Sequence, residues 1–181
     1  LLKTPNIDVN LKDEEGCCAL HLAVSSKKNI ETLKLLLKVP NIDVNQKDNK
    51  GNCALHLAVN SKYNKYNNKA FKLLLAVPNI DVNSVNNNSK SAVGRAVHKN
   101  NIEGLKLLLS HPSLTALTIN QKDIDNGYTP VMVAVSEEDR LKHLEVLAAD
   151  PRVDLDTTDM KGRRLEEWIW WVFLSIIYPN Y

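Results

Sequence analysis

The stretch that decides the fold is Cys18-Ala-Leu-His-Leu-Ala-Val24, which recurs without a change as Cys53-Ala-Leu-His-Leu-Ala-Val59. Two later stretches, Ser91–Val97 and Thr129–Val135, keep the Ala-Val ending of this sequence and little else. A sequence that returns several times in one chain indicates repeated structural units, so the spacing of the copies decides which kind of array they form.

A second string, Pro-Asn-Ile-Asp-Val-Asn, marks the same period. It begins at Pro5, Pro40 and Pro78, and weaker copies follow at Pro112 and Pro151. Successive copies lie roughly 35 residues apart, a period that is typical of stacked supersecondary units. The chain is therefore predicted to be an array in which each unit contacts its neighbours.

Each unit is predicted to hold two short antiparallel helices. Leu20 and Val24 share one helical face, and a second apolar stripe runs from Ile30 to Leu37. The polar residues 25–29 form a turn between them, and Pro40 is expected to end the second helix because its ring clashes with the preceding turn. Helices this short are marginal alone, so the neighbouring units must stabilise them.

The segment that links two helix pairs is predicted to project from the array. Residues 41–52 alternate apolar and polar side chains and then turn at Asp48-Asn-Lys-Gly51. Asp, Asn and Gly are the residues that tight turns favour, so this segment reads as a hairpin-like loop.

The repeated residues resemble the ankyrin signature, Asp-x-x-Gly-x-Thr-Pro-Leu-His-x-Ala. The first copy is Asp13-x-x-Gly16-x-Cys18-Ala19-Leu20-His21-x-Ala23, and the second copy begins at Asp48. The resemblance covers nearly the whole chain. It implies an all-α repeat solenoid of stacked helix-turn-helix pairs with protruding hairpin loops, and a role in binding other proteins. The positions that match the structural motif are Gly16, His21, Gly51, His56, Gly127, Thr129, Pro130 and Gly162.

On this interpretation the chain divides into six segments. They are the end of a truncated preceding repeat (1–10), a repeat (11–45), a repeat with an insertion in its inter-helix turn (46–83), a degenerate repeat (84–120), a repeat preceded by an enlarged hairpin (121–156), and a partial repeat with an apolar tail (157–181). Because Leu1 to Pro5 matches Leu36 to Pro40, the chain is expected to be a fragment of a larger ankyrin-repeat protein.

The copies depart from one another in three places. The third copy lacks the turn glycine and carries Gly94 in place of the histidine, so it is expected to have the weakest local stability, because a helical Gly costs about 1 kcal/mol against Ala. Asn60 to Lys69 is expected to lengthen the turn between two helices. Extra residues within Ser113 to Ile119 are expected to enlarge the next hairpin.

Composition excludes several classes of protein. The chain has 181 residues, 44% of them hydrophobic, and a formal net charge of +2. This apolar content argues against disorder, and the near-zero charge argues against a nucleic-acid or anionic-membrane partner. Three cysteines, Cys17, Cys18 and Cys53, do not make a disulfide framework, which favours a cytoplasmic or nuclear location.

The chain ends in the apolar run Trp168 to Tyr178, which is too short to span a bilayer. Three interpretations are open. The run is an irregular cap over the last unit, a non-native tail, or an anchor to a membrane surface or a partner. Association with a membrane is the least favoured of the three.

Catalysis and metal binding find no support in the residue pattern. The sequence contains no Gly-rich phosphate loop, nucleophile elbow or two-histidine metal motif. His21 and His56 lie one repeat apart, too far to share a zinc ion, and the family resemblance implies that each bonds across neighbouring loops. The chain is therefore predicted to be neither an enzyme nor a binder of a metal, a cofactor or a small-molecule substrate.

The resemblance implies that a protein partner binds the concave face, formed by the hairpin tips and the first helices. The chain is then a monomeric interaction module, and the alternative is a structural spacer within a multidomain protein. For each charged residue at a loop tip, the alternative is that it only keeps the protein soluble. The candidate partner-binding residues are Lys12, Asp13, Glu14, Lys47, Asp48, Asn49, Lys50, Lys90, Lys122, Asp123, Tyr128, Met160 and Arg163.

Three asparagines are candidate sites of modification. Asn10, Asn45 and Asn83 each follow Asp-Val, with a leucine eight positions earlier. This spacing resembles the pattern that asparaginyl hydroxylases recognise in ankyrin repeats, which implies hydroxylation at the three positions. The alternative is that each asparagine serves only the hairpin turn.

Overall fold

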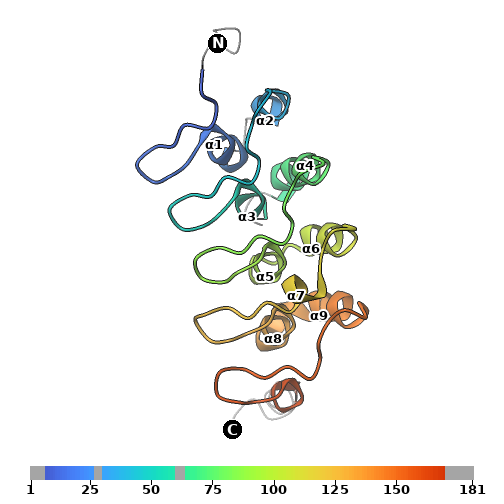
Figure 1. Ribbon diagram of the computed structural model, residues 1–181. Coiled ribbons are helices and arrows are strands. Elements are labelled where there is room, and N and C mark those ends of the chain that lie inside the picture. Colours follow the sequence, from blue (N-terminus) through green and yellow to red (C-terminus); the bar gives the residue numbers. More distant parts are fainter. Residues whose placement is uncertain (1–6, 27–29, 60–63, 170–181) are drawn as a thin grey trace.

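The computed structural model describes residues 7–26, 30–59 and 64–169, in which helix pairs stack one above another (Figure 1). The first helices of the pairs form one column and the second helices form the other. The predicted all-α stack with protruding loops is confirmed. The pairs are α1 (Ala19–Ser25) with α2 (Ile30–Leu36), α3 (Ala54–Ala58) with α4 (Asn64–Leu75), α5 (Ala92–His98) with α6 (Ile102–Leu109), and α8 (Pro130–Ser136) with α9 (Leu141–Ala148).

The core runs without interruption between the two columns. Leu20 and Leu33, which the apolar stripes place inward, are buried, as are Phe71 and Leu74 in α4. Helix α5 packs on α6 within its own pair and on α8 of the next pair, and the other pairs repeat this arrangement. Burial of each short helix is therefore shared between its own unit and its neighbours.

Loops that we call fingers project from the same side of the stack, at residues 9–17, 44–52, 82–90, 120–128 and 156–163 (Figure 1). In the described residues they contain no strand, and isolated bridges occur only at the base of two of them, between Val85 and Ser91 and between Thr158 and Arg164. The Asp48 carboxylate instead holds the tip, because its Oδ1 accepts the N–H groups of Lys50 at 2.9 Å and Asn52 at 2.7 Å. The third finger keeps this turn with Asn86 in place of Asp and with Ser89 at a φ of 54°.

Both predicted insertions fold differently from the expectation. Asn64 to Lys69 lie in α4, so they lengthen a helix rather than the inter-helix turn, and residues 60–63 lie outside the described part. The extra residues before the fourth finger form α7 (Ala116–Ile119), a one-turn helix, instead of enlarging the hairpin. The Thr115 hydroxyl accepts the Thr118 N–H at 3.3 Å and so begins this helix.

The second helices also end before the prolines that were expected to stop them. Helix α2 ends at Leu36, and the Val39 N–H then bonds to the Leu36 carbonyl at 2.9 Å. Pro40 therefore follows a tight turn rather than the last helical residue.

His21 and His56 link each of the first two units to the next. The His21 Nε2 lies 3.0 Å from the Asn52 carbonyl, and its Nδ1 lies 3.1 Å from the Cys18 amide. His56 repeats this contact with the Lys90 carbonyl at 3.1 Å. Because the His56 Nδ1 accepts the Cys53 N–H at 3.3 Å, the His56 ring is neutral and its Nε2 carries the proton that it donates.

Two glycines with the same backbone conformation give a matched test of the finger tips. Gly51 and Gly162 both have a φ of 75°, but an added Cβ at Gly51 would lie 2.6 Å from the Asn87 amide nitrogen, whereas at Gly162 it would meet nothing within 4 Å among the described residues. Gly162→Ala should cost about 1 kcal/mol of unfolding free energy from backbone strain alone. Gly51→Ala should cost at least about 1 kcal/mol more, because the next finger must move. Urea unfolding measures both losses, and equal losses would contradict the close packing of the fingers.

Burial makes the second histidine sensitive to pH. Burial, and then the nearby Arg95 cation, lower the pKa of His56 to about 4. The unfolded chain therefore takes up the proton first, so stability is fully present above about pH 6.5 and is lost as the pH falls toward 4. His56→Gln, which keeps an N–H donor but does not titrate, is the control. Between pH 7 and pH 4.5 the native chain should lose about 2 kcal/mol more unfolding free energy than this variant. Parallel pH profiles would show that His56 is not buried as a neutral ring.

Candidate functional site

The surface formed by the fingers and the first helices, here called the finger face, holds the candidate partner-binding residues. Several of them bond to a neighbouring finger. Lys12 Nζ donates to the Lys47 carbonyl at 2.8 Å, and Lys47 Nζ donates to the Val85 carbonyl at 2.8 Å. Asn49 Nδ2 donates to the Glu14 carbonyl at 2.8 Å. These side chains therefore set the spacing of the fingers.

A second group of candidates shapes single turns. The Asp13 and Asp48 carboxylates accept backbone N–H groups of their own tips, and Asp123 accepts the Asn126 N–H at 2.9 Å. Lys90 forms an ion pair with Asp125 of the next finger at 2.7 Å. The candidates whose side chains face solvent at the tips are Glu14, Lys50, Lys122 and Met160.

Each asparagine predicted as a modification site makes two hydrogen bonds to the following unit. Asn45 Nδ2 donates to the Asn79 carbonyl at 2.7 Å, and its Oδ1 accepts the Asp81 N–H at 2.8 Å. Asn10 makes the same two bonds with residues 41 and 43, and Asn83 makes them with residues 113 and 115. Each asparagine thus bonds to the neighbouring unit rather than serving only its own turn.

Sequence reasoning missed a fourth member of this series. Asn120 donates to the Arg152 carbonyl and accepts the Asp154 N–H, each at 2.8 Å. The sequence did indicate this residue, because Asn120 precedes Lys122-Asp123 at the same spacing as Asn45 precedes Lys47-Asp48. The helix α7 insertion separates Asn120 from its Pro112, so the proline-based alignment hides it.

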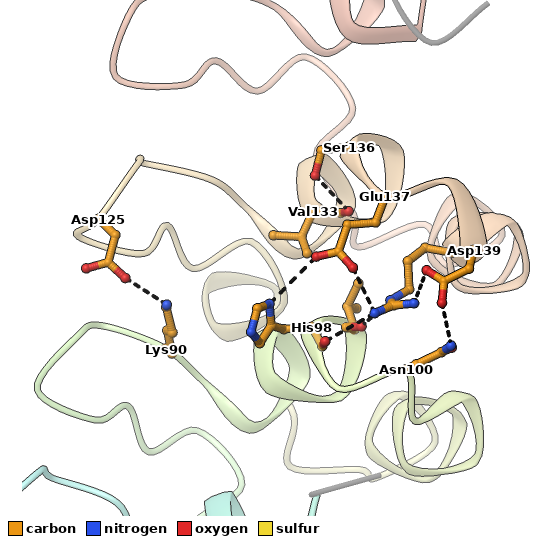
Figure 2. A network of polar contacts seen from close by, with 10 residues as sticks. Lys90, His98, Asn100, Asp125, Val133, Ser136, Glu137 and Asp139 are labelled. Atoms are coloured by element: carbon orange, nitrogen blue, oxygen red, sulfur yellow. Dashed lines mark hydrogen bonds and ion pairs between the residues drawn. The ribbon is translucent and has the colours of Figure 1, made fainter. Parts of the chain in front are cut away.

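A polar network joins the third and fourth units at the ends of α5 and α8 (Figure 2). The buried Arg140, in the 3-10 helix η2 (Glu138–Arg140), donates from Nε to the Val97 carbonyl at 2.9 Å and pairs with Glu137 at 2.8 Å. Asp139 also pairs with Arg140 and accepts from Asn100 at 2.9 Å. The network satisfies carbonyls at the end of α5. Sequence reasoning missed it because its counterpart in the third unit is a different residue, Asn101, which donates to the Val59 carbonyl at 3.1 Å.

The edge of this network contains a histidine that faces the finger side. His98 Nδ1 lies 3.7 Å from a Glu137 carboxylate oxygen. Burial, and then the Lys99 cation, lower the pKa of His98, so its ring is neutral near pH 7. The contact therefore adds little to the Glu137–Arg140 ion pair.

Tyr128 and Arg163, two candidate partner-binding residues, pack on Trp168. The Tyr128 and Trp168 rings meet edge to face with centroids 4.9 Å apart, and the Arg163 guanidinium lies 4.5 Å from the Trp168 ring centroid. Arg163 also pairs with Asp159 at 2.6 Å. Burial opposes ionisation of Asp159, but hydrogen bonds from Arg163 outweigh it and lower the pKa of the carboxyl.

Trp168 is also the first residue of the apolar run at the chain end. Its contacts tie it to the last described unit, and residues 170–181 lie outside the described part. The three interpretations of the run therefore stay predictions. In the described ranges, helices long and apolar enough to cross a membrane are absent. Those ranges also hold no cluster of three or more His, Cys, Asp or Glu side chains arranged to bind a metal.

Comparisons with known proteins identify the architecture. The chain resembles the ankyrin repeat protein EF0377 at a TM-score of 0.78, with 22% identity over 99% of this chain and 88% of the other. It resembles the ankyrin repeat domain of Bcl-3, a member of the IkappaB protein family, at a TM-score of 0.71, with 22% identity over 93% and 72% of the two chains. No curated protein sequence matches significantly. The family model described as ankyrin repeats (3 copies) matches residues 1–76 and 62–159, so the chain belongs to the ankyrin-repeat family.

Proposed function

We propose that this chain is a non-catalytic protein–protein interaction module that binds its partner through the finger face. Ankyrin repeats are in general modules of this kind. The supporting observation is the way the fingers are held. The backbone N–H of Asn49 donates to the Glu15 carbonyl at 3.0 Å, and the backbone N–H of Asn87 donates to the Lys50 carbonyl at 3.1 Å. Tips fixed in this way present their side chains at set spacings, which lowers the entropy lost on binding.

The same proposal places the chain in a larger ankyrin-repeat protein. Leu22 in α1 is 58% exposed, whereas Leu57, its counterpart in α3, packs on the core. Ile7 is 46% exposed and its counterpart Ile80 is 7% exposed. A further repeat stacked on the first unit would cover these side chains.

Free thiols support a cytoplasmic or nuclear location, and the module is proposed to act as a monomer.

The alternative function is a structural spacer, favoured by the many tip side chains that bond to other fingers. A charge-reversal experiment separates the two functions. Lys50→Glu, Lys122→Glu and Met160→Glu together change exposed tips that make no finger-to-finger side-chain bond among the described residues. The matched control carries Lys72→Glu, Lys106→Glu and Leu141→Glu on exposed positions of the second helices, with the same change of charge.

The measurement is quantitative affinity capture with mass spectrometry. The proposal expects a protein retained by the native chain and by the control, and reduced about tenfold or more by the finger variant. Equal capture by all three chains, or capture by none, would favour the spacer.

Hydroxylation of Asn10, Asn45 and Asn83 is proposed as a modification of this module. Because both ends of each side-chain amide bond to the next unit, a hydroxylase would have to act when those bonds open. Peptide mass spectra of natively expressed protein should show a 16 Da addition, the mass of one oxygen atom, at these positions. Unmodified peptides at all three positions would remove the proposal.

A further inference from the structure

A cavity lies between α5 and α8 on the finger face. It has a volume of about 30 Å³, which holds about two waters, and it is partly open to solvent, so a larger group would enter from the open side and fill it only in part. Ser91, Gly94 and Tyr128 line it, together with Pro130 and Val133 from the wall of α8. In the first two units a histidine stands at the position of Gly94, so the third unit differs from them by a missing side chain.

The cavity lies where the missing ring would be. In the first unit the His21 ring lies between the residue that begins its own helix, Cys18, and the Asn52 carbonyl of the next unit. The residues at the matching positions around Gly94 are Ser91 and Tyr128, and both line the cavity. Ser91, Gly94 and Tyr128 therefore line a cavity at the position where the first unit holds an imidazole ring.

The cavity also keeps the acceptor that the ring would use. The Asn52 carbonyl accepts both the Asp48 N–H at 2.9 Å and the His21 ring at 3.0 Å. The matching Tyr128 carbonyl accepts the Asp123 N–H at 3.0 Å, and no side chain within the described ranges donates to it. A carbonyl oxygen has two lone pairs, so one acceptor position stays open beside the cavity.

The surroundings favour a neutral, planar group over a charged one. The charged side chains at the cavity have opposite signs, with Lys90 on one finger and Asp123 on the next. Lys90 is already paired with Asp125, and the Asp123 carboxylate is held by its own turn. Pro130 and Val133 add an apolar wall on which a flat ring can pack.

We propose that this cavity binds the neutral imidazole of a histidine side chain on the partner, with a ring N–H donating to the Tyr128 carbonyl. This inference rests on the finger face being the binding surface. The partner's ring then takes the place that His21 and His56 fill from within the chain.

Free imidazole tests the cavity without any partner. In a titration of the ¹⁵N-labelled chain at pH 8, where the free ring is largely neutral, the amides of Ser91, Gly94 and Tyr128 should shift and saturate. Half-saturation is expected at roughly tens of millimolar, because so small a ring makes few contacts. 1-Methylimidazole has no ring N–H and should bind at least about fivefold more weakly, since it leaves the carbonyl unpaired.

Two variants complete the test. Gly94→His should abolish the shifts because its own ring fills the cavity, and a Cβ at this position meets Pro130 Cγ at 3.8 Å, an ordinary contact. Gly94→Ala, which adds one carbon and favours the helix, should retain them in part.

The absence of saturable shifts up to about 200 mM imidazole would overturn the proposal and leave the cavity to one or two waters, which a space of this size accommodates. Equal shifts in Gly94→His would overturn it as well. Either result leaves the charge-reversal test of the finger face untouched, so failure of the cavity and failure of the interaction module are distinguishable.

Discussion

The backbone of each finger is only partly hydrogen-bonded within that finger, where the Asp48 carboxylate and the Asn52 carbonyl accept N–H groups of their own tip. A strand ladder would pair the remaining groups within one loop, but the described fingers have only isolated bridges. Side chains of the adjacent unit bond to further carbonyls of the finger, as Lys47 does to the Val85 carbonyl and His21 to the Asn52 carbonyl. Each bond contributes about 1 kcal/mol net, so several at every junction make neighbouring units depend on one another. Stacking, core burial and the position of every tip follow from this dependence.

The same dependence explains why helices of five to eight residues persist in this chain. Helix α3 has five residues, far below the length at which an isolated helix is stable. Its apolar residues, including Leu55, are buried between the units on either side. The polar junctions fix how the units are aligned, and the apolar faces supply most of the stability once they are aligned.

The sequence predicted most of what recurs, with Asn120 as the exception, and missed what occurs once. The period, the helix pairs and the finger turns were predictable because Asp48, Gly51 and His56 repeat residues of the first unit. Helix α7 has no repeated counterpart, and the bond that Arg140 makes is repeated by a different residue, Asn101, so only the three-dimensional packing reveals them. The candidate site was predictable as a surface but not residue by residue, because a charged tip such as Lys47 looks free in sequence while its ammonium group bonds to the next finger.

The links between units run in both directions along the stack. Asn45 and His56 reach toward the following unit, whereas Arg95 donates back to the His56 carbonyl at 2.9 Å and Arg140 donates back to the Val97 carbonyl at 2.9 Å. An interior unit is therefore held by two neighbours, and a terminal unit by one. A unit held from both sides must break two sets of links to open, so it is expected to exchange its amide hydrogens more slowly than a unit that has one neighbour. The third unit lacks the histidine, but it is linked on both sides, by its own Arg95 to the second unit and by Arg140 of the fourth.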